Sequence, residues 1–408
     1  MQERSSIAAS MGRRGAGFTA LLLVWFVNGA LSGPLTTQLP VYIDTLHRPV
    51  ILTSSLQAVQ MGFGGVFSLL GGILADRIGI KRALLIGMAG SLFACLEFYR
   101  SDVLGLVVLA ALAGAAIGCQ SVASQAYLLS VLRGLGLGLG AAAFFLGNTL
   151  GSSLGNAIAG IGLNRYGFAP TMAVDLVGSG LLVGVAALCL PAIRRVGHAE
   201  SLGTTLVGFG HLLRREGVWL LCSVRYLTTC YWGAVTLLLP LLIYEHTGSK
   251  AAAGIYAAVS LASAACCSLA VGRISDHVGR TRPAIVLVCI IIVDAFLLAR
   301  VSGSYPGLFA AGVLGASTAW SLSAVMPGLI DGVSREGEKG RAVGLLQGVW
   351  SAAMLSGALI GGVLIAHGTA VPFLVVGCAN LLSLVAVIAL ARRIGTGVPK
   401  RLEEEKAS

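Results

Sequence analysis

Charged side chains are scarce in this sequence. Of its 408 residues only 11% are charged and 56% are hydrophobic, and the mean hydropathy is +0.88. A typical soluble domain carries about 25% charged residues, which cover its surface with groups that bind water. The composition therefore excludes an ordinary soluble enzyme of this length and indicates a chain that is solvated by a lipid bilayer.

Patterns typical of a bound metal, a nucleotide or a disulfide framework are missing. The nine cysteines lie in apolar stretches at spacings that match no zinc site, so we interpret them as small packing residues. The glycine-rich run 133–140 superficially resembles a phosphate-binding loop, but no strand precedes it, and no Gly-x-x-x-x-Gly-Lys-Ser/Thr motif occurs. We therefore expect no ATP-driven pump in this chain, no enzyme and no catalytic residue, no metal and no cofactor.

Apolar stretches long enough to cross about 30 Å of hydrocarbon occur twelve times. This pattern predicts an all-α membrane protein with twelve transmembrane helices, six in each half of the chain. The predicted spans are residues 17–43, 51–75, 83–99, 103–131, 136–162, 170–192, 218–243, 251–275, 284–300, 305–330, 342–366 and 371–391.

The sequence also contains an internal repeat. Residues 72–82 and 272–282 carry Gly, Asp, Gly and a basic residue at matching positions, where an apolar span ends and a basic loop begins. An offset of 202 residues likewise aligns Gly155 and Gly160 with Gly357 and Gly362. Parallel repeats are typical of secondary transporters, which hold their substrate between the halves near the bilayer midplane. We expect two pseudo-symmetric six-helix bundles.

These features divide the chain into four parts. We predict an N-terminal bundle over residues 1–193 and a C-terminal bundle over 218–391, with a cytoplasmic tail over 392–408. Apolar residues recur at helical spacing in the linker 194–217, which predicts an amphipathic helix on the membrane surface. The basic leader precedes a span too long for a secretory signal, so we expect it to be retained.

Basic residues are distributed unevenly between the predicted loops. With a cytoplasmic N-terminus, 22 of the 28 Lys and Arg residues lie on the cytoplasmic side. Cytoplasmic loops of membrane proteins are enriched in these residues, so the pattern predicts a multi-pass protein of the inner or plasma membrane with both termini in the cytoplasm. The net charge of +11 then reflects topology, and we expect no nucleic-acid partner.

The twelve spans, the repeat and the loop motif together resemble the major facilitator superfamily over nearly the whole chain. The family's loop signature is Gly-x-Leu-Ala-Asp-Arg/Lys-x-Gly-Arg/Lys-Arg/Lys. The first copy departs from it at Ile80, and the second, looser copy has His277 and Thr281 at usually basic positions. The resemblance implies a monomer whose two bundles rock around a central substrate site.

Residues of the repeated loop are candidates for a conformational latch. Gly79 permits a tight turn, and Asp76 can meet the positive N-terminal end of a neighbouring helix. In the superfamily, by resemblance, this cluster joins the halves on the cytoplasmic side in one state and releases them in another. The alternative is a basic loop that only fixes orientation and contacts lipid headgroups. The candidates are Gly72, Asp76, Arg77, Gly79, Lys81, Arg82, Asp276, Gly279 and Arg280.

Arg225 is the one charged residue predicted at mid-span in the helices that, by resemblance, line or flank the central site. A charge at membrane depth is costly unless it faces water, a partner or a ligand, and a guanidinium suits a carboxylate or a phosphate. This predicts a small organic anion or an anionic amphiphile as substrate. Alternatively, Arg225 extends its side chain to the headgroups from near Trp219.

Polar and aromatic residues of the same helices complete the predicted substrate site. From Arg225 a helical stripe continues through Thr229 to Trp232, and the repeat places Trp25 and Asn28 at matching heights in the first span. The predicted substrate-binding residues are Arg225, Asn28, Trp25, Gln120, Gln125, Thr229, Trp232 and Trp320.

Three acidic residues within the predicted spans are candidates for proton coupling: Asp294, Glu97 and Asp175. Asp294 is the deepest, and an intramembrane acid is costly unless it is buried and paired. Since its span is peripheral in the family, a structural hydrogen bond within one half is the alternative. We expect coupling to protons rather than to sodium.

The sequence therefore predicts a secondary active transporter that moves a small organic solute by alternating access. Multidrug or metabolite efflux with broad specificity is the alternative. The proton route of the drug antiporters is in doubt, because Ala113 and Gly114 lie where that branch has an arginine and residues 151–155 lack its Gly-Pro pair. A lipid-handling or sensor protein is the alternative outside transport, although we expect a sensor to carry a sizeable soluble domain.

Overall fold

The first half of the chain forms seven helical segments in the computed structural model. They are α1 (Gln2–Thr45), α2 (Val50–Ile78), α3 (Ile80–Met88), α4 (Gly90–Glu97), α5 (Val103–Val131), α6 (Leu137–Tyr166) and α7 (Phe168–Cys189). The structure describes residues 2–131, 137–192, 210–334 and 339–394, without the side chains of 2–16, 69, 72, 73, 76, 137–139, 141, 142 and 339–341. Most of the predicted amphipathic linker and the tail beyond residue 394 lie outside the described residues.

The second half repeats the pattern. It consists of α9 (Glu216–Thr247), α10 (Lys250–Val278), α11 (Thr281–Val301), α12 (Tyr305–Val333), α13 (Lys339–Leu364), the short 3-10 turn η1 (Ile365–His367) and α14 (Val371–Ile394). No strand occurs in the described ranges. Ten of the helices are long and apolar enough to cross a membrane, and α6 and the consecutive pair α3 and α4 occupy the other two predicted spans. The predicted all-α fold with twelve crossings is confirmed.

The third predicted span, 83–99, differs from a continuous helix. It divides into α3 and α4 at Ala89, between two glycines that lie directly against α5. A Cβ atom at Gly87 would come within 2.5 Å of the backbone of Gln120, and one at Gly90 would come within 2.7 Å of Ala116. The close approach needs glycine on both sides of Ala89, and glycines are common where helices kink.

The repeat predicted from the sequence extends to helix packing. In the first half Gly155 of α6 lies against the backbone carbonyl of Ala30 in α1, and in the second half Gly357 of α13 lies against that of Cys230 in α9. The two contacts are related by offsets of 202 and 200 residues. Glycine allows the backbones to touch, which is how helices associate in lipid, where no hydrophobic force drives them together.

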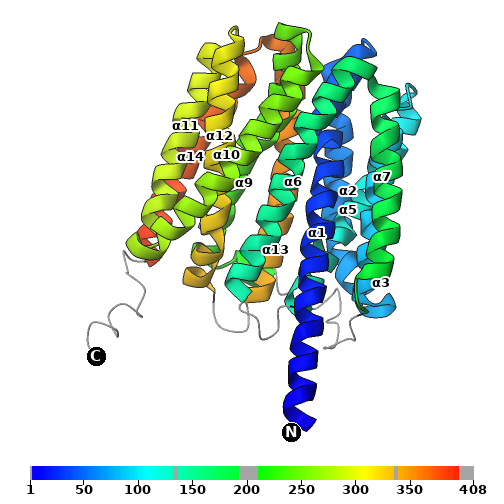
Figure 1. Ribbon diagram of the computed structural model, residues 1–408. Coiled ribbons are helices and arrows are strands. Elements are labelled where there is room, and N and C mark those ends of the chain that lie inside the picture. The colour runs from blue at the N-terminus through cyan, green and yellow to red at the C-terminus, as the bar shows by residue number, and fades with distance from the viewer. Residues whose placement is uncertain (1, 132–136, 193–209, 335–338, 395–408) are drawn as a thin grey trace.

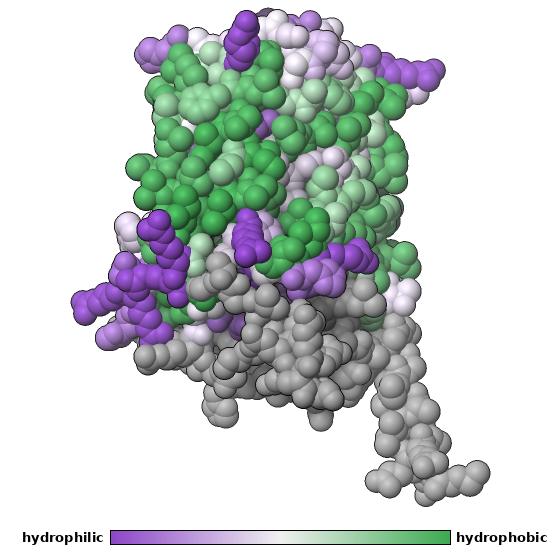
Figure 2. All heavy atoms as spheres, turned by 90° about the vertical axis from the view of Figure 1, so that its left-hand side faces the viewer, coloured by the Kyte–Doolittle hydropathy of each residue, from purple (hydrophilic) through white to green (hydrophobic). Residues whose placement is uncertain are grey.

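On the face drawn in Figure 2, a broad zone of apolar side chains lies between two polar zones. Many apolar side chains of the helices are exposed, among them Leu104, Val174 and Leu188, and such a surface is one that a bilayer would cover. Helix α1 begins and α14 ends at the same end of the bundle (Figure 1). We call this the basic end, because the turns at Gly79 and Gly279 and their arginines lie there. We call the other end of the bundle the opposite end.

The two halves meet through α6 and α10 near the opposite end. The Cα of Gly254 would be 2.9 Å from a Cβ at Gly160, and the hydroxyl of Ser153 donates a hydrogen bond of 2.7 Å to the carbonyl of Ala258. Figure 1 shows α9 and α10 leaning toward α6 at this end. The two bundles are therefore joined directly, helix against helix, on this side of the membrane centre.

Helices α2 and α13 form the second junction between the halves. Gly362 lies against the side chain of Ser54 near the opposite end, and a Cβ at Gly65 would be 3.3 Å from that of Ser351 near the helix centres. The pairing is antiparallel, because the position on α13 falls as that on α2 rises. The two junctions, α6 with α10 and α13 with α2, are related by the same repeat as the bundles.

Candidate functional site

The side chain of Arg225 lies between α9 and α12, about 14 Å along α9 from its start at Glu216. Its guanidinium donates a hydrogen bond of 2.8 Å to the hydroxyl of Ser323. No carboxylate of the described residues forms an ion pair with it, and none of its nitrogens is a buried atom without a partner. The side chain of Arg225 is partly buried and keeps donor groups that no described side chain occupies.

Two exposed aromatic residues lie near Arg225 or its partner Ser323 in the sequence. Tyr226 follows it in α9 and donates a hydrogen bond of 2.8 Å to the hydroxyl of Ser356 in α13. Trp320 lies one helical turn before Ser323 in α12, and Tyr226 and Trp320 are each 37% exposed. A guanidinium beside exposed aromatic rings can bind the charged group of a ligand while the rings contact its apolar part.

Two of the four N-terminal candidates form a hydrogen bond with each other. Asn28 is buried and its amide oxygen accepts a hydrogen bond of 3.1 Å from Gln120, which links α1 to α5. Trp25 is also buried, and its ring stacks on Phe144 of α6 at 4.6 Å. Gln125 is exposed. The structure brings Asn28 and Gln120 together but shows no contact between them and the surface around Arg225.

The remaining C-terminal candidates pack into their own half. Thr229 is buried, and Trp232 packs against the hydrophobic core of that half. Neither makes a described contact with Arg225, although the predicted stripe joins all three.

Asp294 of α11 is completely buried, and one of its carboxylate oxygens accepts a hydrogen bond from the phenol of Tyr231 in α9. Its other oxygen has no partner. Glycine in α12 allows this arrangement, because a Cβ at Gly315 would come within 2.6 Å of the carboxylate. The pair therefore lies directly against the backbone of α12.

Glu97 and Asp175 lie in the N-terminal half, on α4 and α7. Both are buried, and each has one carboxylate oxygen without a hydrogen-bond partner. Helices α4 and α7 pack against each other. Neither acid is connected to Asp294 or Arg225 by any described contact, so the two halves hold separate buried acids.

Both copies of the loop motif contain a glycine with positive φ. Gly79 ends α2 at φ 96° and Gly279 ends α10 at φ 85°, a region that favours glycine because a Cβ is disfavoured there. Arg77, Arg82 and Asp276 are exposed at the basic end. Gly72 and Asp76 lie outside the residues whose surroundings the structure describes.

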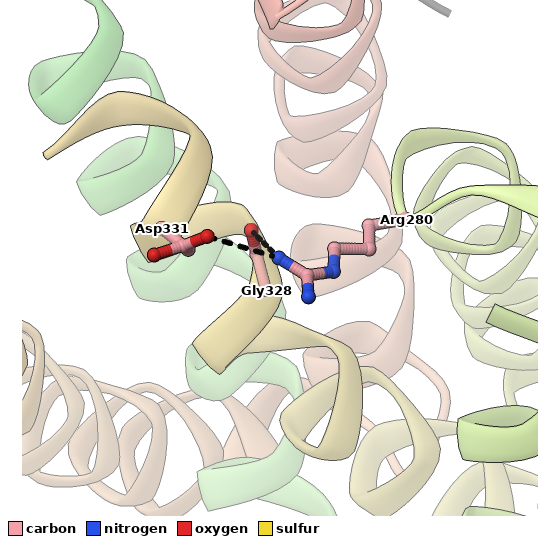
Figure 3. A network of polar contacts seen from close by, with 3 residues as sticks. All are labelled: Arg280, Gly328 and Asp331. Carbon is pink, nitrogen blue, oxygen red and sulfur yellow. Dashed lines mark hydrogen bonds and ion pairs between the residues drawn. The ribbon is translucent and has the colours of Figure 1, made fainter. Parts of the chain in front are cut away.

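One basic side chain from each copy of the motif contacts its own half. Arg280 donates a hydrogen bond of 3.1 Å to the carbonyl of Gly328 and forms an ion pair of 3.5 Å with Asp331, both in α12 (Figure 3). In the first copy, the ammonium of Lys81 donates to the carbonyl of Ala187 in α7 at 2.6 Å. Each loop is thus attached to a helix of its own bundle.

Sequence reasoning missed the hydrogen-bond partners of its strongest candidates. Ser323, Ser356 and Tyr231 belong to the site because they bind Arg225, Tyr226 and Asp294. Ser323 follows Trp320 by three residues, so helical spacing could have indicated it. No sequence pattern identifies Tyr231, because its partner lies 63 residues away on another helix.

Comparison with protein families gives one match over most of the chain. The model described as Major Facilitator Superfamily matches residues 16–330 and 235–408. Among individual proteins, the chain is 31% identical over 172 residues to the inner membrane transport protein YdhP of Escherichia coli O157:H7 and equally to that of strain K12. These matches cover 40% of this chain and 43% of each relative, less than half of either protein.

Comparison with solved structures shows the same fold. The crystal structure of the nucleoside transporter NupG has a TM-score of 0.77 at 13% identity and covers 92% of this chain and 99% of that one. A POT family transporter in complex with 5-aminolevulinic acid has a TM-score of 0.77 at 12% identity, and covers 93% of this chain and 96% of that one.

Proposed function

The chain belongs to the major facilitator superfamily, and on that premise we propose that it is a secondary active transporter of a small organic anion. Its two bundles rock around a central site, and Arg225 binds the carboxylate or phosphate of the substrate. The observation that carries the proposal is the unpaired guanidinium of Arg225, held at membrane depth by one neutral hydroxyl.

Energetics support a ligand for Arg225. A cation at membrane depth without a counterion costs free energy, and an anionic ligand would recover it. The hydrogen bond to Ser323 leaves the guanidinium able to form a bidentate ion pair with a carboxylate or a phosphate. A lysine cannot form such a pair. Exposed Tyr226 and Trp320 would contact the apolar part of an anionic amphiphile.

The junctions between the halves support alternating access. The described contacts join the bundles between the membrane centre and the opposite end. In our proposal the state described here exposes the substrate site toward the basic end, which faces the cytoplasm. In the second state of the transport cycle, the loop motif latches the halves together at the basic end. The protein would act as a monomer in the cell membrane, in contact with its lipids, with both termini cytoplasmic.

A ligand-stabilisation screen on purified protein tests the substrate class. Small carboxylates and organic phosphates should raise the apparent stability more than neutral or cationic compounds, by about 2.7 kcal/mol at a hundred times Kd. Arg225→Lys should raise the Kd of the stabilising anion about tenfold, and Arg225→Ala should raise it further. The reason is that charge-assisted hydrogen bonds contribute about 1.5–3 kcal/mol.

Arg300→Ala is the matched control, since Arg300 is an exposed arginine at the end of α11. It should leave the anion response unchanged. Equal responses of wild type and Arg225→Ala would contradict the proposal, and preferential stabilisation by cationic compounds would favour multidrug efflux instead.

A further inference from the structure

The buried pair of Asp294 and Tyr231 has a feature that a structural hydrogen bond does not require. A phenol satisfies one oxygen of the carboxyl group, but the other oxygen is fully enclosed and has no partner. A carboxylate in this position would be a buried charge with half of its hydrogen-bonding capacity unused, which is costly. A carboxylic acid carries no charge, so the site is suited to hold a proton.

The groups around Asp294 offer no positive charge. Helix α9 contributes Tyr231, and α10 contributes Tyr256, whose hydroxyl would lie 2.6 Å from a Cβ at Gly312 of α12. Helix α12 faces the pair with Gly315, and α14 packs on α11 with Gly377 against Ala295 and Phe296. Among the described residues, no lysine, arginine or histidine lies within ion-pair distance of Asp294.

Arg225 and the Asp294 pair share one interface. Arg225 and Tyr231 are six residues apart on α9, about 9 Å along its axis, and their neighbours on α12, Ser323 and Gly315, are eight residues apart, about 12 Å. The contact between the antiparallel helices α9 and α12 thus contains Arg225 at one level, and at another level it contains Tyr231 and Gly315, which contact Asp294 of α11. The charges are separated by on the order of 12 Å.

We propose that Asp294 is a proton-binding site linked electrostatically to Arg225, so that one proton and one monovalent anion bind the C-terminal half together. This rests on the proposed function of Arg225. The anion cancels the charge of the guanidinium, and Asp294 then gains a proton that cancels its own. The anion and the proton are released together on the other side of the membrane. The translocation step of this symport therefore moves no net charge.

The strength of the linkage follows from the separation. At about 12 Å and an effective dielectric constant of about 20, removing the positive charge of Arg225 should strengthen proton binding at Asp294 about tenfold. Tyr231 is a positioning residue, because it holds the carboxyl group without contacting the substrate.

Infrared difference spectroscopy of the purified, ligand-free protein between acidic and alkaline buffer tests the proton site. Wild type should show a carbonyl band of a buried carboxylic acid that is lost as the pH rises. Asp294→Asn should remove that band, and Glu97→Gln and Asp175→Asn should not. Tyr231→Phe should move the band to higher frequency, because the carbonyl loses its phenol donor. Tyr226→Phe is the control, since that hydroxyl binds Ser356 instead.

The same titration tests the linkage. Arg225→Gln and Arg225→Met should each shift the midpoint of the Asp294 band up by about one pH unit, which is the tenfold change in affinity. Arg225→Lys keeps the positive charge and should leave the midpoint of the Asp294 band unchanged. Because there are two neutral variants, one that folds is enough to test whether the charge of Arg225 affects proton binding at Asp294. An unchanged midpoint would overturn the linkage, and a spectrum unchanged by Asp294→Asn would overturn the proton site. Neither result depends on anion binding, so failure of the substrate proposal is detected separately.

Discussion

Replacing one glycine in each half should show that helices within each bundle are held together by direct backbone contact. In Gly155→Ala the new Cβ would lie 2.6 Å from the carbonyl carbon of Ala30 in α1. In Gly357→Ala it would lie 2.9 Å from the carbonyl carbon of Cys230 in α9. Because both neighbours are backbone atoms, no side-chain rotation can relieve either contact.

The magnitude follows from the missing space. Carbon atoms pack at about 3.5–4.0 Å, so α6 must move away from α1 by about 1 Å to accept the alanine at position 155. Overpacking of this kind costs about 1–3 kcal/mol. Position 357 has a smaller deficit, so we expect Gly357→Ala to destabilise the protein less than Gly155→Ala.

Each variant has a control in the same helix. A Cβ at Gly147 of α6 would make only an ordinary contact of 3.9 Å, and one at Gly348 of α13 would meet nothing within 4 Å. Equilibrium unfolding in mixed detergent and SDS micelles should give free energies close to wild type for Gly147→Ala and Gly348→Ala. Equal stability of Gly155→Ala and Gly147→Ala would refute the packing of α1 against α6 described here.

Two further predictions concern the repeated loop. Gly79→Ala should destabilise the protein by about 1–2 kcal/mol in the same unfolding assay, since φ is positive there, whereas Gly272→Ala, with nothing within 4 Å, should be neutral. Asp76→Asn should lower transport in vesicles while the amount of protein stays constant, if the motif latches the halves. Unchanged transport would contradict the latch and indicate that the loop only fixes the orientation of the protein in the membrane.

The bilayer explains why so much of the fold could be predicted. Backbone groups in hydrocarbon must be satisfied within a helix, so an apolar span has one available structure, and the spans could be located from composition. The repeat then indicated which helices are equivalent, and it correctly aligned Gly155 with Gly357, whose contacts correspond in the structure. The break at Ala89 was not predicted, because it depends on how closely α5 approaches the third span.

The site was less predictable, because its contacts join side chains on different helices. The sequence identified Arg225 and Asp294 through the cost of a charge in the membrane, but it could not identify Ser323 or Tyr231 as their partners. It also placed Asn28 and Gln120 in one site without indicating that they bind each other. Periodicity reveals which face of a helix a residue occupies, whereas pairing depends on the relative height and rotation of two helices.

Alternating access itself can be measured by the distances between spin labels at both ends of the molecule, in a variant with its nine native cysteines replaced. Labels at exposed Arg48 and Thr369 report on the opposite end, and labels at exposed Arg82 and Arg282 report on the basic end. Acidic buffer and a stabilising anion should populate a second state in which the first distance lengthens while the second shortens. Distances that stay fixed, or that change in the same direction at both ends, would contradict the account.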